Sequence, residues 1–301
     1  MLEIRTVLGN IPENKLGKVL PHEHVFCYSD YLYAMAGKEY LDKEKIFQYA
    51  FDHIKMMKEK YALSTFIDCT PINIGRDVTF MKDLSEKTGV NIICSSGFYY
   101  TEESLFIRTS SETLCEYIVK DAENINAGII KCAVESEDVS PFNEKLLRAT
   151  AKAQLKLGLP IVMHTNAQRK NGIKALEIIL LEGVKPCCVT VGHLSDTEDV
   201  DYIKYFAECG CYVGLDRLYG NYTDEYIANK LRTINSLCEA GYEDRILLSH
   251  DALFFSGFNP QNGVIRTPRF NYVFDNILPR LNETLVDKIT TENPLKMLKC
   301  E

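Results

Sequence analysis

Eight short apolar runs alternate with longer amphipathic stretches along the 301 residues of the chain, and this alternation limits what it can fold into. Each run is mostly apolar on both faces, as expected of strands in a parallel sheet that helices cover. The runs span residues 18–26, 64–70, 91–98, 128–134, 160–166, 188–194, 211–217 and 245–251.

The stretches between the runs have the periodicity of amphipathic helices. Asn143 and Asp196 stand where two of these helices would be capped, and Gly158 and Gly183 stand where two would end. The predicted helices span residues 42–62, 143–158, 173–183, 197–209 and 224–240.

The order strand then helix, repeated eight times, predicts a (β/α)8 TIM barrel of the α/β class, with residues 1–301 as a single domain. A doubly wound sheet is the rival architecture. Against that alternative, no GxGxxG follows the first run and the sequence contains no P-loop.

The composition is that of an ordinary globular protein, with 46% hydrophobic and 25% charged residues. A net charge of −8 argues against nucleic-acid binding, which needs a basic face. No apolar run reaches the roughly 20 residues that span a bilayer, and no signal peptide is recognisable. The eleven cysteines lack zinc-site spacing, so we expect free thiols in a reduced, cytoplasmic protein whose partner is a small-molecule substrate, not a nucleic acid or a membrane.

Six polar residues lie in or at the C-terminal ends of the predicted strands, where the active sites of barrels form. They are His22, His24, Lys131, His164, His193 and Asp251. Residues two apart on a strand face the same side, so the two histidines of the first run aim at one point and Glu23 between them faces away.

Each of these residues has an ordinary structural alternative. A single histidine at a strand end usually forms a structural hydrogen bond, and Asp251 alone could cap a helix. Lys131 is harder to explain in this way, because it lies in the apolar run GIIKCAV and a buried ammonium group is costly. Carboxylation by carbon dioxide is one outcome for such a lysine, and the resulting carbamate can bridge two metal ions.

Taken together, the six residues predict a metal centre. They include four of the six histidines of the chain. Imidazole and carboxylate ligands without thiolates suit Zn2+, Mn2+, Fe2+ or Co2+. Several such ligands and a bridging anion suit a two-metal hydrolytic site.

The order HxH, then Lys, His, His and Asp on successive strands resembles the amidohydrolase superfamily, and within it the phosphotriesterase family with its lactonases. The local matches cover nearly the whole chain: TVLGNIPENKLGKVLPHEHVF, AGIIKCAV, PIVMHTN, VGHLSD, GLDR, LLSHD and TTENPLKML.

This resemblance implies two divalent metal ions per chain, with Zn2+ as the first expectation and Mn2+, Co2+ or Fe2+ as alternatives. The more buried ion would be held by His22, His24 and Asp251, the more exposed ion by His164 and His193, and both by N6-carboxylated Lys131 and a nucleophilic hydroxide. Asp251 would also be the catalytic proton acceptor. Some relatives use a glutamate as the bridge, and Glu135 is the rival for Lys131 here.

In lactonases of the family, a tyrosine and an arginine at the positions of Tyr99 and Arg217 contact the substrate. Aromatic packing and a surface ion pair are the structural alternatives for these two residues. His250, next to Asp251, should point into the layer between barrel and helices. His53, on the first amphipathic helix, should be a surface or packing residue.

The segment 252–274 after the last run is long enough to be a lid or binding loop. It contains Arg266, Arg269 and Tyr272, which could bind an anion such as the phosphate of a sugar lactone. A solvated basic loop is the alternative.

Three functions follow in order of preference. The first is hydrolysis of lactones or related carboxylic esters, with phosphotriester hydrolysis as a side activity of the same metals. The second is hydrolysis of an amide, such as an N-acylated amino acid. The third is a barrel that binds a ligand without catalysis. Family members are often homodimers, so the resemblance is compatible with a homodimer.

Replacing Lys131 by alanine is expected to remove both bound metal and hydrolytic activity, because the bridging carboxylate is lost. Short carboxylic acids added to the variant should restore part of the activity. Elemental analysis and hydrolysis rates check this expectation. A variant that retains both metal ions without added acid would contradict the bridging role.

Overall fold

The eight predicted runs all form parallel strands, and each strand is hydrogen-bonded to the next one along the chain. The computed structural model describes residues 3–102, 104–218, 223–257, 264–265 and 270–301. The strands are β3 (Lys18–Cys27), β4 (Leu63–Asp68), β5 (Asn91–Gly97), β6 (Ile129–Ala133), β7 (Ile161–His164), β8 (Val189–Val191), β9 (Tyr212–Leu215) and β10 (Ile246–Leu248).

The barrel closes through a second half of the eighth strand. After β10 the strand is interrupted at residues 249–252 and then continues as β11 (Leu253–Ser256). β10 pairs with β9, whereas β11 pairs in parallel with β3, the first barrel strand. A short antiparallel strand, β12 (Val264–Ile265), adds to β11. The predicted (β/α)8 barrel is therefore confirmed.

Backbone hydrogen bonds across the interruption complete the closure. Asp251 N donates to the carbonyl oxygen of His22 at 3.1 Å, and His24 N donates to the carbonyl oxygen of Ala252 at 2.9 Å. The two ends of the sheet thus meet at the histidine pair of β3.

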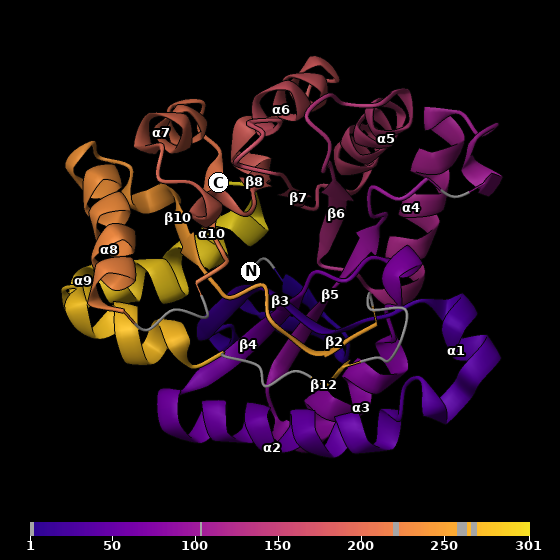
Figure 1. The fold of residues 1–301 in the computed structure, drawn as a ribbon, viewed down its shortest axis with the longest axis horizontal. Helices are drawn as coiled ribbons and strands as arrows, with labels where there is room; N and C mark the ends of the chain where they lie inside the picture. Colours follow the sequence, from indigo (N-terminus) through magenta and orange to yellow (C-terminus); the bar gives the residue numbers. More distant parts are fainter. Residues whose placement is uncertain (1–2, 103, 219–222, 258–263, 266–269) are drawn as a thin grey trace.

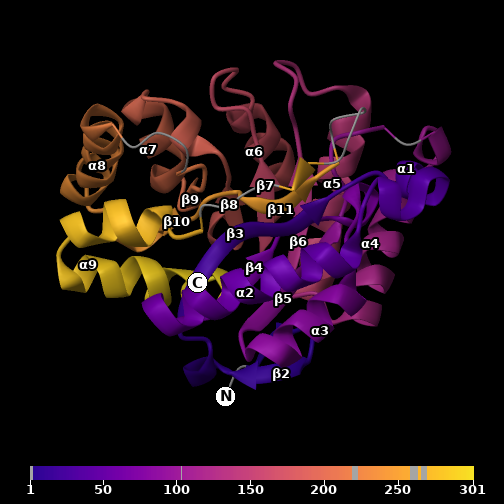
Figure 2. The same ribbon diagram turned by 60° about the horizontal axis from the view of Figure 1, so that its bottom comes forward.

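Helices surround the strands on the outside of the barrel, as Figures 1 and 2 show. The α-helices of the described residues are α1 (Asp30–Ala36), α2 (Lys43–Tyr61), α3 (Val78–Thr88), α4 (Ser111–Ile125), α5 (Pro141–Leu157), α6 (Gly172–Leu181), α7 (Val200–Glu208), α8 (Asp224–Glu239), α9 (Glu283–Asp287) and α10 (Asn293–Lys299), the last of which packs against the barrel interior. A hairpin of β1 (Glu3–Thr6) and β2 (Gly9–Pro12) precedes the barrel. Within the described residues, no helix combines the length and apolarity that crossing a bilayer requires.

Two helix caps differ from the sequence expectation. α5 is capped by Ser140, whose hydroxyl accepts a hydrogen bond from Asn143 N, so Asn143 lies inside the helix. α7 is capped by Asp199, whose carboxylate accepts a hydrogen bond from Tyr202 N at 3.0 Å. Asp196 lies before the helix, and its carboxylate accepts a hydrogen bond from Arg217. Gly158 ends α5 in the left-handed conformation, with φ of 69°, as predicted.

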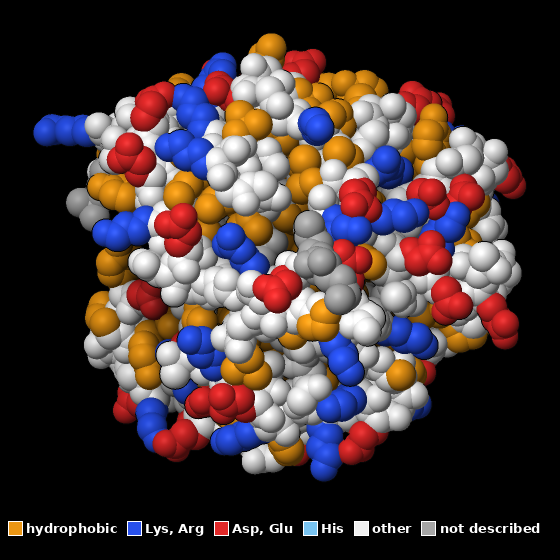
Figure 3. Space-filling model, turned by 180° about the vertical axis from the view of Figure 1, so that it is seen from behind, with side chains coloured by type: hydrophobic (Ala, Val, Ile, Leu, Met, Phe, Trp, Pro, Cys, Tyr) orange, Lys and Arg blue, Asp and Glu red, His pale blue; other side chains and the backbone are white. Residues whose placement is uncertain are grey.

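Apolar side chains form two separate layers. One layer lies between the strands and the helices. The other fills the barrel interior, where Leu16 and Met297 join side chains that project inward from the strands. These strand residues include Val19, Ile67, Ile93, Val162, Tyr212 and Leu247. On the surface that Figure 3 shows, acidic and basic side chains are interspersed.

Replacing Leu16 by alanine tests the interior layer. Its side chain is 1% exposed, so the loss of buried apolar contacts should lower the free energy of unfolding by about 2–5 kcal/mol. Urea unfolding measures the change. The matched control is Leu181→Ala at a side chain that is 75% exposed, for which a change within about 0.5 kcal/mol is expected. Equal losses in the two variants would argue against a packed interior at Leu16.

Candidate metal centre

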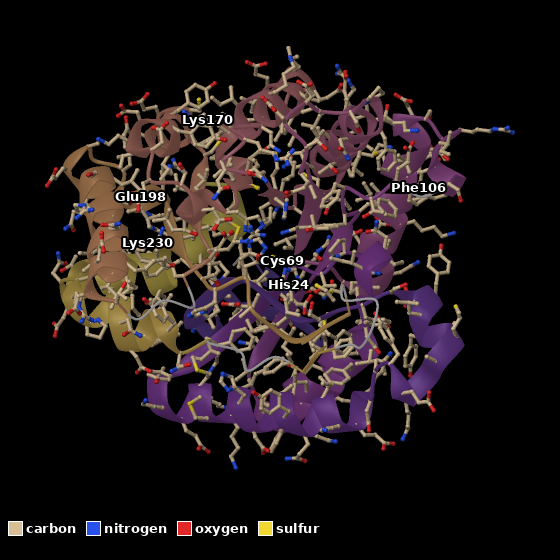
Figure 4. All side chains as sticks on the ribbon, viewed as in Figure 1. His24, Cys69, Phe106, Lys170, Glu198 and Lys230 are labelled. Carbon is tan, nitrogen blue, oxygen red and sulfur yellow. The ribbon has the colours of Figure 1, made fainter. Side chains whose placement is uncertain are left out.

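The six polar residues predicted from the strand ends come together inside the C-terminal end of the barrel. His22 and His24 lie on β3, Lys131 on β6 and His164 at the end of β7, and Figure 4 shows His24 near the centre of the ring of strands. His193 follows β8, and Asp251 lies in the interruption of the eighth strand. The four histidines and the lysine are buried, and Lys131 is only 1% exposed.

One group of atoms converges around Asp251. The Nε2 atom of His24 lies 3.0 Å from Asp251 Oδ1, and the Nε2 atom of His22 lies 3.6 Å from the same oxygen. The Nζ atom of Lys131 lies 2.7 Å from His22 Nε2.

A second pair of nitrogens lies beside the first group. His164 Nδ1 and His193 Nε2 are 2.7 Å apart. The rings of His22 and His193 are 5.0 Å apart between centroids. One ligand atom each from His22, His193 and Asp251 lies within 4.8 Å of the other two. The two groups are therefore adjacent and share Asp251 as a neighbour.

The buried carboxylate of Asp216 contacts one histidine of each group. Its Oδ2 atom lies 2.5 Å from His22 Nδ1, and its Oδ1 atom lies 3.0 Å from His193 Nδ1. Oδ1 also accepts a hydrogen bond from His193 N at 2.7 Å. Each ring therefore carries its proton on Nδ1 and presents Nε2 as a lone pair to the interior.

The other two histidines are fixed in the same way. His24 Nδ1 lies 2.8 Å from the hydroxyl of Thr70, which leaves Nε2 facing Asp251. His164 Nε2 lies 2.9 Å from Glu135 Oε2, which leaves Nδ1 facing inward. Glu135 thus contacts the outer nitrogen of a histidine. All four imidazoles have one nitrogen held by an outer partner and one available to a ligand.

The protonation states suit metal binding. Burial lowers the pKa of His22, lowers that of His164 to about 4 and holds that of His193 well below its ordinary value. Burial alone would raise the pKa of Asp251, but the neighbouring histidines, His193 foremost, hold it well below the ordinary range. Neutral imidazoles and an ionised carboxylate are the forms that bind metals.

His24 differs from the other three histidines. Burial lowers its pKa, but the neighbouring Cys27 and Asp251 outweigh that effect and raise the pKa to about 10. A cation bound at Nε2 would therefore displace a proton from this ring.

Two of the candidate ligands have unusual backbone conformations. His193 and Asp251 adopt the left-handed region, with φ of 64° and 48°. Non-glycine residues rarely do so, and such strain concentrates at functional sites where surrounding contacts enforce it.

Two predicted substrate residues lie beside these groups. Arg217 Nε donates to Asp251 Oδ2 at 2.8 Å, and its Nη1 donates to Asp196 Oδ2 at 2.7 Å. The ring of Tyr99 packs edge-on against His164, with 5.3 Å between centroids. Both side chains therefore border the candidate metal centre.

Of the three residues predicted to bind an anion, the structure describes only Tyr272. Tyr272 is 1% exposed and packs against Tyr226, with 6.2 Å between ring centroids, in the layer between barrel and helices. This position favours a packing role over contact with a substrate. Arg266 and Arg269 lie outside the described residues.

The remaining histidines occupy packing positions, as predicted. His250 points away from the candidate centre, and its Nδ1 lies 2.6 Å from the carboxylate of Glu23. His53 is half-buried and packs against the rings of Phe254 and Phe270. All eleven cysteines are free thiols.

Sequence reasoning missed Asp216. The sequence did contain a signal for it. Asp216 lies four residues beyond Tyr212 of β9, and Tyr212 belongs to the interior layer. Alternation along the strand therefore places Asp216 on the inner side.

Comparison with known proteins assigns the chain to a family. A model of the phosphotriesterase family matches residues 2–298. The chain belongs to the phosphotriesterase family. Members similar to it include the aryldialkylphosphatase of Saccharolobus solfataricus, which is 30% identical over 95% of this chain and 96% of the relative. The phosphotriesterase homology protein of Mycobacterium tuberculosis is 29% identical over 94% and 92%. The N-acetyltaurine hydrolase of Homo sapiens is 28% identical over 98% and 97%.

As a member of the phosphotriesterase family, the protein is a hydrolase. Its cluster of His22, His193 and Asp251 could hold a metal ion. The residues of this cluster fit such an ion, because the inward nitrogens of His22 and His193 are unprotonated and the Asp251 carboxylate is ionised.

Replacing Asp216 by asparagine is expected to lower the affinity for Zn2+ by about 10–100-fold, the usual effect of losing an outer partner of a metal-binding histidine. Competition with a chromophoric chelator measures the affinity. Asp121→Asn is the control, because this carboxylate pairs with Arg76 away from the centre. Unchanged Zn2+ affinity in a folded Asp216→Asn variant would contradict the role of Asp216.

Proposed function

We propose that the protein is a hydrolase with two divalent metal ions that acts on lactones or related carboxylic esters. The observation that supports this most is the pair of adjacent ligand groups, one around Asp251 and one between His164 and His193. Two such groups side by side suit the two-ion sites of hydrolases.

In this proposal one ion is held by His22, His24 and Asp251, and the other by His164 and His193. The ions supply, when bound, the activation of water and the polarisation of the scissile carbonyl or phosphoryl oxygen. Zn2+ is the preferred ion, because imidazole and carboxylate ligands suit it, with Mn2+, Co2+ and Fe2+ as alternatives.

Carboxylation of Lys131 is part of the proposal. Its Nζ atom lies 2.7 Å from His22 Nε2, and within the described part of the chain Lys131 forms no ion pair. A buried ammonium beside an imidazole that metal binding requires to be neutral is unfavourable. A carbamate would remove the cation, and Lys131 would then offer carboxylate oxygens as metal ligands.

Asp251 and Arg217 have complementary roles. Asp251 takes a proton from the attacking water, since its carboxylate is ionised and faces the histidines. Arg217 donates to both Asp251 and Asp196, so it fixes the direction in which the Asp251 carboxylate points. Tyr99, against the ring of His164, borders the space where the acyl group would lie.

The leaving group distinguishes the first function from its alternative. An amine must be protonated to leave, so hydrolysis of an amide depends on proton transfer to the leaving group more strictly than hydrolysis of a lactone does. The proton that Asp251 takes from the attacking water is the one it can pass to the leaving group. The alternative is an amide hydrolase, and the similarity to N-acetyltaurine hydrolase favours it. The similarity to aryldialkylphosphatase is consistent with phosphotriester hydrolysis as a side activity.

A substrate screen on Zn2+-reconstituted protein tests the proposal. Lactones, with and without a phosphate group, should be hydrolysed at least about tenfold faster in kcat/KM than N-acylated amino acids. Asp251→Asn should lower hydrolysis by about 10²–10⁴-fold, the usual contribution of a general base. Chelation of the metal should abolish hydrolysis.

The outcomes separate the alternatives. Faster hydrolysis of N-acylated amino acids would replace the lactonase with the amide hydrolase. A chain that binds no metal and hydrolyses neither panel would support a binding protein without catalysis.

A further inference from the structure

The middle residue of the HEH motif, Glu23, has an environment unlike that of its two neighbours. Its side chain is fully buried on the outer side of β3. The carboxylate accepts hydrogen bonds from Ser249 Oγ at 2.8 Å, His250 N at 3.0 Å and Ala252 N at 2.9 Å. It also accepts one from His250 Nδ1 at 2.6 Å. All four donors belong to the interruption between β10 and β11.

This interruption is the part of the chain that carries Asp251. The backbone groups of residues 250 and 252 turn outward to Glu23, whereas Asp251 N turns to the carbonyl oxygen of His22. Alternation of this kind directs the Asp251 side chain to the inner side, where it meets His24. The Glu23 carboxylate therefore satisfies the backbone N–H groups of His250 and Ala252, which do not face the backbone of β3.

The backbone of Asp251 requires such support. Its φ of 48° is unfavourable for a residue with a Cβ atom. A strained conformation persists only where surrounding contacts enforce it. The hydrogen bonds to Glu23 flank Asp251 on both sides, at His250 and Ala252.

His250 links Glu23 to the helix that begins at Val273. Its Nδ1 donates to Glu23, so its Nε2 carries the lone pair and accepts a hydrogen bond from Val273 N at 3.1 Å. Val273 begins the π-helix η8 (Val273–Ile277). His250 thus has two separable contacts, one through each ring nitrogen.

We propose that Glu23 is a positioning residue for Asp251: it holds the interrupted eighth strand in the conformation that turns the Asp251 carboxylate toward His22 and His24. The consequence for metal binding rests on the function proposed above. The consequence for the backbone does not, because it concerns hydrogen bonds within the chain alone.

The direct test is Glu23→Gln, which preserves size but places an NH2 group among four donors. Amide hydrogen exchange of the segment 246–256 should become faster than in the wild type, with or without metal. Release of bound Zn2+ to a chromophoric chelator should become about tenfold faster or more, the scale known for outer contacts of metal sites. The absorption spectrum of the Co2+-substituted protein should change, since it reports ligand geometry.

A matched pair at His250 tests the same contact without altering Glu23. The amide nitrogen of asparagine can take the place of Nδ1, so His250→Asn retains a donor to Glu23 and loses the acceptor for Val273 N. The amide oxygen of glutamine can take the place of Nε2, so His250→Gln retains the acceptor and loses the donor. We expect the glutamine variant to release Zn2+ faster than the asparagine variant. Asp121→Asn, which breaks the Arg76 ion pair elsewhere, is the control for a general loss of stability.

Distinct results would overturn the proposal. Wild-type amide exchange at 246–256 and a wild-type Co2+ spectrum in Glu23→Gln would show that Glu23 does not position Asp251. If Glu23→Gln fails to fold, equal Zn2+ release from the two His250 variants would be the contrary result. A wild-type protein that binds no metal would refute the proposed function instead, while faster exchange in Glu23→Gln would still support the positioning role.

Discussion

Closure of the barrel depends on the four residues that interrupt the eighth strand. The half before the interruption, β10, pairs with β9, and the half after it, β11, pairs with β3. The same four residues carry Asp251 to the histidine pair. One local departure from regular strand geometry therefore completes the sheet and brings a carboxylate to the candidate metal centre.

The polar cluster inside the barrel can be buried because its side chains form hydrogen bonds with one another. Asp216 contacts two histidines, Glu135 and Thr70 contact one each, and Glu23 satisfies the interrupted strand from the opposite side of β3. Buried polar groups are costly only where partners are lacking. Partnered in this way, the inward nitrogens of His22, His164 and His193 are kept unprotonated, and that of His24 faces the Asp251 carboxylate.

Local sequence patterns predicted the parts of the structure that depend on local geometry. Runs of apolar residues identified all eight barrel strands, and the spacing of His22 and His24 by two placed both on one side. Patterns of this kind could not predict β11, because its partner is β3 at the other end of the chain. They also misplaced the cap of α7, which is Asp199, whereas Asp196 accepts a hydrogen bond from Arg217, which follows β9.

The same limit applies to the residues around the centre. Alternation on β9 could have placed Asp216 inside, but its contact with both His22 and His193 depends on strands that are distant in sequence. Tyr272 resembled a binding residue because of its arginine neighbours, whereas its side chain is buried in the apolar layer between barrel and helices, where it packs against Tyr226 of α8. Predictions from sequence were accurate for the strands and for the side of β3 that each histidine faces, whereas they missed the contacts of Asp216 with two distant strands.

The pairing of β3 with β11 also affects how the chain folds during its synthesis on the ribosome. The residues that meet at the centre, His24 and Asp251, are 227 positions apart. At a synthesis rate of about 5–20 residues per second, roughly 10–45 s separate their appearance on the ribosome. Throughout that interval one edge of β3 has no partner, and unpaired strand edges invite association between chains. A chain that ends before residue 249 would contain five of the six clustered polar residues and would still lack a closed barrel.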